Sequence, residues 1–283
     1  MSNPIADPFV EVVDTDATSA LVRLDATPEG VATVTINRPS RGNALDFEVI
    51  GALREAFETL AGADGVRLVF LDGAGAAFSA GVDVDWMRAS ADHTAADNRD
   101  DALAAAVMFK HLHDLPVLTV ALVHGAAFGL GAGLVAACDM AIATADARFA
   151  FPEARSGLVA ATVSPYVAAA VGPRRTRALF ASARTFDAPY ALAIGLVDEI
   201  VQNAAALRLA KAALARDVFA TAPGAVGEAK RMVNKLGGRA LDHALMDELA
   251  HTVARIRRGP EAHEGVQAAL ETRPPRWGVA GDA

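Results

Sequence analysis

Two glycine-rich segments constrain the fold of this chain more than any other feature. They cover residues 78–83 and 124–133, and each follows a short apolar run that is typical of a buried strand. Glycine at a strand exit lets the backbone turn sharply and lets a ligand approach the main chain closely. Two bare N–H groups aimed at one point stabilise a developing oxyanion. The pair of turns therefore predicts a site for charge that appears on a carbonyl oxygen.

The second glycine-rich segment belongs to an apolar stretch, residues 116–138, whose spaced glycines also suit a packed membrane helix. Another interpretation fits better. Residues 118–123 form a short run rich in β-branched side chains, and His124 and Gly125 then interrupt it. The stretch therefore predicts a buried strand, a turn and a core helix, and we expect no association with a membrane.

Short apolar strands alternate with helical patterns between residues 20 and 200, which is typical of an α/β fold. Residues 20–26 and 31–37 predict a hairpin. Residues 66–71 and 140–143 predict two further strands, the first of them largely buried.

Helices fill the intervals between these strands. Asp46 predicts the N-cap of a helix that ends at Gly62. Residues 84–113 predict helical structure, in which residues 92–101 are polar enough to form an exposed, mobile stretch. Residues 131–138 predict a short core helix.

The pattern changes after residue 201, where the strands end and helical periodicity alone continues to residue 258. A helical tail of this kind packs on its own core or on a neighbouring subunit. We therefore divide the chain into a core, residues 1–202, and a C-terminal helical region, residues 203–283. The first part of the core, residues 1–18, is expected to be disordered or extended.

The charge balance and the cysteine content exclude several classes of partner. The 283 residues carry a formal net charge of −8, whereas surfaces that bind nucleic acid or anionic membranes are basic. Any anionic ligand must therefore be held by local arginines. The one cysteine, Cys138, excludes an intramolecular disulfide, and the first residues lack a secretory pattern. We expect a cytoplasmic protein.

Glu153 places an acid or base twenty residues after Gly133. Its neighbours Phe149, Phe151 and Pro152 are apolar, so burial should raise its pKa. A thioester becomes acidic at its α-carbon, or open to the addition of water, only when charge on its oxygen is stabilised. Two N–H donors and one carboxylate therefore suit enolate chemistry on a thioester.

Other motifs have simpler explanations. Residues 129–133 begin like a dinucleotide fingerprint, but Leu134 stands where the third glycine is required. His111 and His113 point to opposite sides of a helix, so we predict no metal site. The cluster of arginines at 174–177 fits a solvated helix start, with a contact to ligand phosphates as the alternative.

Several strings, in this order along the chain, resemble the enoyl-CoA hydratase/isomerase (crotonase) superfamily over residues 31–201. They are residues 35–39 (TINRP), 42–45 (GNAL), 78–83 (FSAGVD), 124–129 (HGAAFG) and 137–139 (ACD). At residues 86–87, 124–129 and 161–166, the chain is most similar to bacterial hydratases of methylglutaconyl-CoA or carboxygeranoyl-CoA.

The resemblance implies an α/β fold with a crotonase-like ββα spiral core and a C-terminal α-helical oligomerisation region, which builds a homotrimer or a dimer of trimers. It implies an acyl-CoA substrate and no separate cofactor, because coenzyme A is part of the substrate. The amides of Val82 and Leu130 would form the oxyanion hole, and Glu153 would be the acid/base. The residues that would bind the coenzyme A or acyl part are Arg38, Arg41, Asn43, Ala44, Ala80, Gly81, Asp83, Val84, Trp86, Met87 and Gly129.

Two positions depart from the family pattern. Well-studied hydratases carry a second glutamate where this chain has Gly133, so the pair of carboxylates that positions water is incomplete. Thr162, Ser164 or Tyr166 are the alternatives for that role. The family usually has glycine in place of Leu130, whose side chain would narrow or reshape the acyl site.

We therefore predict a lyase of the enoyl-CoA hydratase type. A double-bond isomerase with a single catalytic glutamate is one alternative. An acyl-CoA-binding protein with little turnover is the other.

Overall fold

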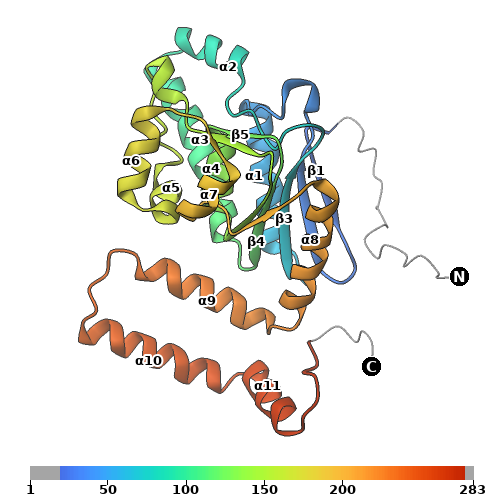
Figure 1. Cartoon of the computed structure of the whole chain (residues 1–283). Coiled ribbons are helices and arrows are strands. Elements are labelled where there is room, and N and C mark those ends of the chain that lie inside the picture. Colours follow the sequence, from blue (N-terminus) through green and yellow to red (C-terminus); the bar gives the residue numbers. More distant parts are fainter. Residues whose placement is uncertain (1–19, 278–283) are drawn as a thin grey trace, which may run out of the picture.

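The computed structural model describes residues 20–277, so the prediction for residues 1–18 lies outside the described residues. Strands and helices alternate through an α/β core, and the last helices extend from one end of it (Figure 1). The α/β prediction is confirmed.

A six-stranded sheet runs through the core. Its strands are β1 (Val22–Ala26), β2 (Val31–Ile36), β3 (Leu68–Gly73), β4 (Leu118–Val123), β6 (Met140–Thr144) and β9 (Glu199–Val201). They lie in the order β1-β2-β3-β4-β6-β9. β1 pairs antiparallel with β2, as the predicted hairpin requires, and all the other neighbours are parallel. The carboxyl ends of β3 and β4 therefore meet at one edge, and both glycine-rich segments begin there.

Three short strands form a second sheet: β5 (Ala126–Phe128), β7 (Arg148–Ala150) and β8 (Phe186–Asp187). β5 pairs parallel with β7, and β7 pairs antiparallel with β8. The sequence predicts only a turn between the strand that ends at Val123 and the following helix, so β5 is an addition to that prediction. This small sheet positions Glu153, because β7 ends three residues before it.

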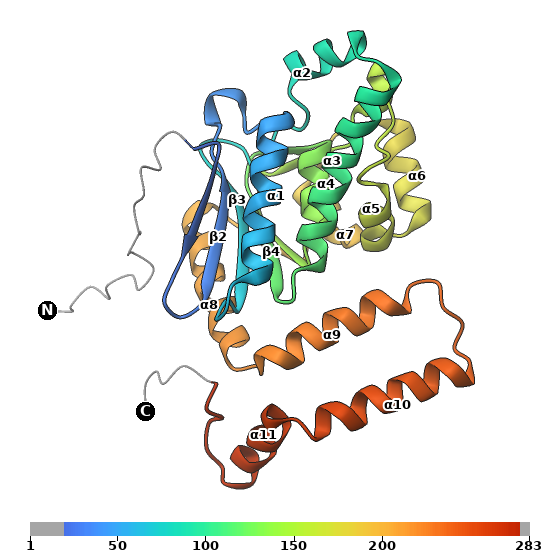
Figure 2. The same cartoon turned by 180° about the vertical axis from the view of Figure 1, so that it is seen from behind.

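Helices cover both faces of the main sheet. α1 (Phe47–Gly62) and α3 (Ala95–Asp114) lie side by side on one face (Figure 2). Asp46 caps α1 as predicted, because its side chain accepts the N–H of Val49 at 3.0 Å. On the other face α8 (Ala204–Phe219) packs on β6 and β9, and the apolar cluster on this face includes Phe70, Leu122 and Phe219.

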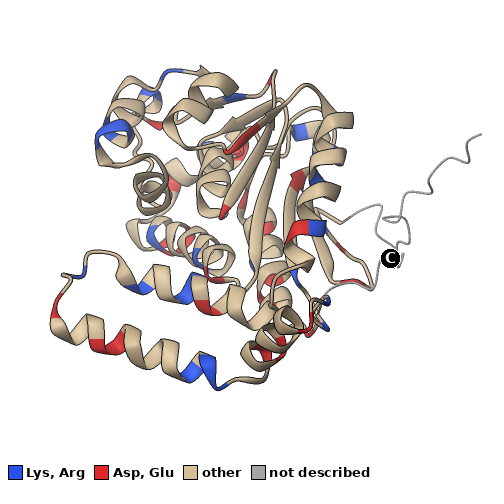
Figure 3. Ribbon diagram, turned by 60° about the horizontal axis from the view of Figure 1, so that its bottom comes forward, with Lys and Arg blue, Asp and Glu red and all other residues tan. Residues whose placement is uncertain are grey.

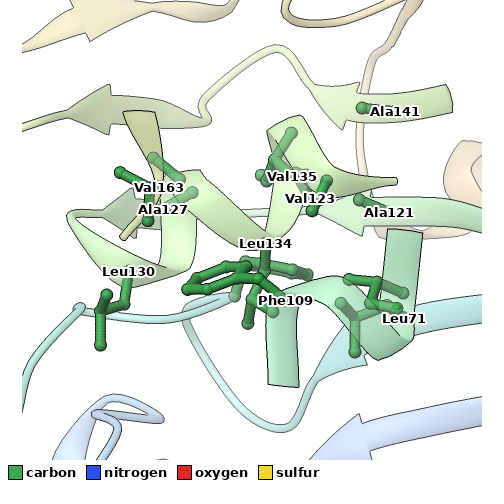
Figure 4. Packing of buried hydrophobic residues seen from close by; sticks show 14 of the residues in the cluster. Leu71, Phe109, Ala121, Val123, Ala127, Leu130, Leu134, Val135, Ala141 and Val163 are labelled. Carbon is green, nitrogen blue, oxygen red and sulfur yellow. The ribbon is translucent and has the colours of Figure 1, made fainter. Parts of the chain in front are cut away.

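The remaining helices of the core connect the strands. They are α2 (Val84–Ala89), α4 (Leu130–Ala137), α5 (Ser164–Val171), α6 (Pro173–Ser182) and α7 (Ala188–Ile194), with the short 3-10 helices η1 (Pro39–Arg41), η2 (Ser90–Asp92) and η3 (Glu153–Ser156). α4 lies at the centre of the larger apolar cluster, between the sheet, α3 and Val163 (Figure 4).

The predicted helical stretch over 84–113 is divided, which corrects the prediction of a continuous pattern. α2 ends at Ala89, and α3 begins at Ala95 after a break. Thr94 and Asp97 form a capping box at that break, since each side chain accepts the backbone N–H of the other. This reciprocal pair begins a new helix at a point where the spacing of apolar residues alone does not indicate a break.

The C-terminal region is helical as predicted: α9 (Pro223–Leu236), α10 (His243–Arg257) and α11 (Pro260–Leu270) follow α8. Lys230 fastens α9 to the core by donating to the Val117 carbonyl at 2.7 Å and to the Asp139 carboxylate at 2.6 Å. Acidic and basic residues are interspersed along these helices (Figure 3). Large apolar side chains on these helices and on the connection between α9 and α10 are also exposed, namely Val233, Leu236, Leu241, Met246, Val253, Val266 and Leu270.

Arg67, just before β3, holds the end of the described chain. Its guanidinium donates to the carbonyl oxygens of Thr221 at 2.7 Å and Trp277 at 3.2 Å. Across residues 20–277, no helix is both long enough and apolar enough to pass through a bilayer.

Candidate active site

The two glycine-rich turns lie against each other. The Ser79 N–H donates to the Ala126 carbonyl at 2.9 Å, and the Phe128 N–H donates to the Ser79 carbonyl at 3.0 Å. These bonds form a parallel bridge between Ser79 and Ala127. The turns that follow β3 and β4 are therefore joined by main-chain hydrogen bonds, as the sequence predicts for a shared site.

Glycine is required where the turns touch. Gly81 has a φ of 95°, and a Cβ atom on it would lie 2.7 Å from the Phe128 carbonyl oxygen. Gly129 has a φ of 50°, in the region that residues with side chains rarely adopt. A side chain at Gly81 would force the turns apart, and one at Gly129 would strain the backbone and press on Glu153.

The amide of Val82 is left without a partner by the local strand pairing. Leu45 donates its N–H to the Gly81 carbonyl, and its own carbonyl accepts the N–H of Asp83. N–H groups alternate in direction along an extended strand, so the Val82 N–H is directed away from Leu45. Within residues 20–277 it donates to no acceptor.

The amide of Leu130 is bare for a different reason. Leu130 is the first residue of α4, and the first N–H groups of a helix have no acceptor within it. The preceding Gly129 N–H is used, since it donates to the Ala150 carbonyl at 2.9 Å. The positive end of the α4 dipole adds to the field at this point.

Glu153 enters the same space from β7. Its Oε1 lies 3.0 Å from the position that a Cβ atom on Gly129 would occupy. Its Oε2 is buried and finds no hydrogen-bond partner among the described residues. Burial raises the pKa of Glu153, as its apolar neighbours predict, because desolvation disfavours the ionised form. A half-buried carboxylate with one oxygen free of partners is suited to proton transfer.

Asn43 supports the first turn through its side-chain hydrogen bonds. It is fully buried, and its φ of 56° lies in the left-handed region, which asparagine tolerates. Its side-chain amide donates to the carbonyl oxygens of Ala74 and Ala77, and its Oδ1 accepts the Arg38 N–H. The hydrogen-bonding groups of Asn43 are thus engaged with the protein, so this predicted substrate-binding residue holds the turn in shape.

Ser79 links Asn43 to Gly81, the residue before the bare amide of Val82. Its hydroxyl donates to the Asn43 carbonyl at 2.8 Å and accepts the Gly81 N–H at 3.2 Å. Sequence reasoning did not assign Ser79 a role. Its position between two turn residues was the available signal, but a bond to Asn43, thirty-six residues earlier, is a property of the tertiary fold.

Ion pairs hold the segment that follows the first glycine-rich turn. Arg38 pairs with Asp46 at 2.8 Å and with Asp83 at 2.9 Å. Burial alone would raise the pKa of Asp83, but the N–H groups of Trp86 and Asp85 and the charges of nearby arginines together lower it. Asp83 is thus an ionised N-cap of α2, and Arg38 lies within a buried network.

The other predicted binding residues line the strip that leads into α2. Arg41 is half exposed and pairs with Asp85 at 2.7 Å, which leaves it at the surface. Ala80 is exposed and ties the strip to Gly42 by its N–H, whereas Ala44 is buried. Val84 is 58% exposed, and Trp86 and Met87 on α2 are partly buried. The strip is therefore open to a ligand beside the two turns.

The space beside Gly133, where related hydratases carry a second glutamate, is filled by other side chains. Gly133 lies in α4, and a Cβ atom on it would lie 2.2 Å from Cγ1 of Val163. Phe109 packs nearby, at 3.1 Å from the same point. Val163 and Phe109 are both fully buried against α4 (Figure 4). Apolar packing thus occupies the direction in which a second carboxylate would have to project.

The three alternatives for a second water contact differ in their surroundings. Ser164 donates its hydroxyl to the Ala161 carbonyl at 2.8 Å. The Tyr166 ring packs on Phe109 and His113. Thr162 is half-buried.

The residues set aside in the sequence lie away from these turns or serve the fold. His113 packs on Tyr166, and His124 contacts Asp72 at 3.6 Å and the Gly75 carbonyl at 3.1 Å. Burial raises the pKa of the Cys138 thiol. Across residues 20–277, no three His, Cys, Asp or Glu side chains are grouped so as to hold a metal ion.

Comparisons with known proteins show the family of this chain. Residues 26–280 match the family described as enoyl-CoA hydratase/isomerase. A Thermus thermophilus protein named after enoyl-CoA hydratase is 36% identical over 248 residues, which is 87% of this chain and 97% of that protein. The crystal structure of an enoyl-CoA hydratase from Shewanella pealeana is 31% identical, with a TM-score of 0.87 over 91% of this chain and 96% of that one.

The crystal structure of an enoyl-CoA hydratase from Mycobacterium smegmatis resembles this chain to a similar extent. It is 33% identical and has a TM-score of 0.85, over 92% of this chain and 99% of its own. The family match spans most of the chain, and the solved relatives share the fold at more than 30% identity. The chain belongs to the enoyl-CoA hydratase/isomerase (crotonase) superfamily.

Proposed function

We propose that the protein is a lyase of the enoyl-CoA hydratase type, which adds water to a 2-enoyl-CoA or runs the reverse dehydration. In this proposal the N–H groups of Val82 and Leu130 hold the thioester oxygen, and Glu153 transfers the proton. One observation carries the proposal. The Glu153 carboxylate lies against Gly129, directly beside the bare amide of Leu130 and next to the turn that contains Val82.

The chemistry needs only these groups. The ionised Glu153 takes a proton from water while the water oxygen bonds to the β-carbon, and the electrons of the double bond move onto the thioester oxygen. Each fixed N–H donor there is worth about 10²–10³ in rate. Glu153, now protonated, returns the proton to the α-carbon as the carbonyl re-forms. The thioester itself is the electron sink, so the proposed mechanism uses no metal or redox cofactor.

The coenzyme A part of the substrate is proposed to lie along the open strip beside the turns. Arg41, Ala80 and Val84 are its exposed residues. Arg41 can offer charge to a phosphate by exchanging its exposed partner Asp85. Arg38 and Asn43 would act indirectly, by holding the strip in place.

A trimer or dimer of trimers remains part of the proposal. The exposed apolar side chains of α9 and α10 favour contact with another copy of the chain. Light scattering coupled to size-exclusion chromatography measures this directly. The cytoplasmic location stays a prediction from the sequence.

The test of the proposed function is Glu153→Gln on a panel of 2-enoyl-CoA substrates. We expect the variant to lose about 10²–10⁴-fold in kcat, which is the usual contribution of general acid–base catalysis. Calorimetry should show that it still binds the substrate. Retention of more than a tenth of the rate would remove Glu153 from the mechanism, and binding without turnover by the unmodified protein would favour a binding protein.

A double-bond isomerase is the second candidate, and the closure of the space beside Gly133 favours it. One carboxylate can take a proton from one carbon and return it two carbons away, with no water to position. Incubation of an enoyl-CoA in ¹⁸O-labelled water separates the two reactions. Label in the product shows hydration, and a shifted double bond without label shows isomerisation.

A further inference from the structure

His124, the residue that follows β4, contacts the loop that leads from β3 to the first turn. This loop comprises residues 74–77, after the end of β3 at Gly73. The Nε2 of His124 donates to the Gly75 carbonyl oxygen at 3.1 Å. Its main-chain carbonyl accepts the N–H of Phe78 at 2.9 Å. A single residue thus holds the middle of the loop with its side chain and the end of the loop with its backbone.

The loop is held in place by hydrogen bonds more than by packing. Gly75 and Ala76 are exposed, so the apolar core does not fix them. Asn43 donates to the first and last carbonyl oxygens of the loop, those of Ala74 and Ala77. Within residues 20–277, the ring of His124 is the one partner of the carbonyl between them, that of Gly75. Loss of this bond would free the middle of the loop.

The ring of His124 is also limited in how it can turn. Its Nδ1 lies 3.6 Å from Oδ1 of Asp72, which is longer than a hydrogen bond but close enough for attraction. That carboxylate oxygen is itself fixed, since it accepts the Gly73 N–H at 2.8 Å. The half-buried ring therefore lies between two acceptors of one segment, Asp72 at the end of β3 and Gly75 in the loop.

We infer that His124 is a positioning residue, whose ring N–H holds the loop so that the first turn presents the Val82 N–H to the thioester oxygen. The inference rests on the proposed function, which assigns the Val82 amide to the oxyanion. A carbonyl oxygen can only accept, so the nitrogen that faces Gly75 carries the hydrogen. In this role His124 touches no substrate and acts through the main chain.

The catalytic effect follows from the geometry that an oxyanion donor requires. A donor in the hole stabilises charge that develops in the transition state, and its contribution falls when it is displaced. Misplacement of a reacting group by about 1 Å costs about 10²-fold. Loss of an interaction that is made mainly in the transition state lowers kcat and leaves KM little changed. We therefore expect a change at His124 to appear in kcat.

The first experiment compares two variants with side chains of similar length. His124→Gln keeps an N–H that can reach the Gly75 carbonyl, whereas His124→Met fills the space without a donor. With a 2-enoyl-CoA substrate, we expect His124→Met to lose about 10–10²-fold in kcat, with a much smaller change in KM. His124→Gln should recover most of the loss. Equal kcat values in the two variants would overturn the inference, because filling the space would then be all that matters.

The second experiment follows the loop without any substrate, by hydrogen exchange measured with mass spectrometry. Peptides that cover residues 74–82 should exchange faster in His124→Met than in the unmodified protein, and His124→Gln should restore the slower exchange. Asn37→Ala is the control. It removes a similar bond from a side-chain amide to a main-chain carbonyl, that of Ala20 at 2.9 Å, and should change neither exchange in this segment nor kcat.

The two measurements separate the inference from the proposed function. Unchanged exchange in His124→Met, or faster exchange with no loss of kcat, would overturn the positioning role while leaving the proposed function intact. If the unmodified protein turned over no enoyl-CoA, the proposed function would be contradicted and the catalytic part of the inference would fall with it. The exchange rates would then still show whether His124 holds the loop.

Discussion

The carboxylate of Glu153 lies against Gly129, so that any side chain on Gly129 would have to displace it. A Cβ atom on Gly129 would lie 3.0 Å from Oε1, a separation that neighbouring atoms accept only by moving. The Gly129 N–H is also tied to the Ala150 carbonyl, on the strand that leads to Glu153. The backbone of the second turn therefore sets the position of the proposed acid/base.

We predict that Gly129→Ala lowers kcat/KM by about tenfold or more, because the new Cβ atom strains the turn and displaces Oε1 of Glu153, and a misplacement of about 1 Å costs about 10²-fold. Enoyl-CoA turnover measures the loss. Gly157→Ala is the matched control. Gly157 also has a positive φ, 71°, but nothing lies within 4 Å of its Cβ position. Equal losses in the two variants would assign the effect to backbone strain and not to Glu153.

Glu153 is predicted to lower the stability of the fold at neutral pH. Burial raises its pKa above the ordinary value of 4.5, so the native carboxyl holds its proton more tightly than the unfolded one does. The native state is then favoured below the unfolded pKa, and this advantage is lost as the pH rises through the raised, folded pKa. Above that range, the ionised carboxylate is a net cost, because burial outweighs its one backbone hydrogen bond.

Glu153→Gln should therefore have a higher Tm than the unmodified protein at about pH 7, and the difference should shrink at about pH 4, where both side chains are neutral. Thermal unfolding followed by circular dichroism at the two pH values measures it. A variant that is less stable at pH 7 would mean that the ionised carboxylate finds partners in solution.

Gly133 and Val163 are predicted to be energetically coupled. Gly133→Ala should destabilise the protein by about 1–3 kcal/mol, because the new Cβ atom overpacks against Val163. Val163→Ala removes the methyl groups that it meets. In the double variant the loss from Gly133→Ala should be smaller than in the single one. A double-mutant cycle from urea unfolding gives the coupling, and strictly additive losses would contradict the packing described for this site.

Asn43 is predicted to be necessary for the first turn. Asn43→Ala removes the bonds to Ala74, Ala77 and Arg38 and leaves buried main-chain groups unpaired, at a cost of about 2–4 kcal/mol. Activity should fall as well, because the turn that presents Val82 loses its support. Asn37→Ala is the control, since Asn37 makes one exposed bond to Ala20 and should cost less than about 0.5 kcal/mol. Unfolding midpoints in urea and kcat/KM measure both effects.

The local elements of the fold could be predicted because their signals are local. The hairpin closed at Gly30 and the helix capped by Asp46 each depend on a few neighbouring residues. The division before α3 was also encoded locally, in Thr94 and Asp97, but the apolar periodicity on either side obscured it. Strand β5 has only three residues, and its pairing with β7 depends on residues about twenty positions later.

The candidate site was predictable to the extent that its groups come from the backbone. Glycine marks where the turns must come close, and apolar neighbours of Glu153 indicated its raised pKa. The roles of Ser79 and Val163 were not predictable, because Ser79 acts through Asn43 and Val163 acts by occupying the space beside Gly133. These are tertiary contacts between segments that no sequence pattern connects.

The ladder between Ser79 and the chain from Ala126 to Phe128 has a consequence for how such a site can change. Peptide groups are alike at every residue, so mutation of the surrounding side chains leaves the rungs of this ladder in place. Evolution can then reshape the walls that select a ligand without respacing the two turns. The side chains that select the ligand can thus vary, while the main-chain groups proposed to stabilise the oxyanion keep their positions.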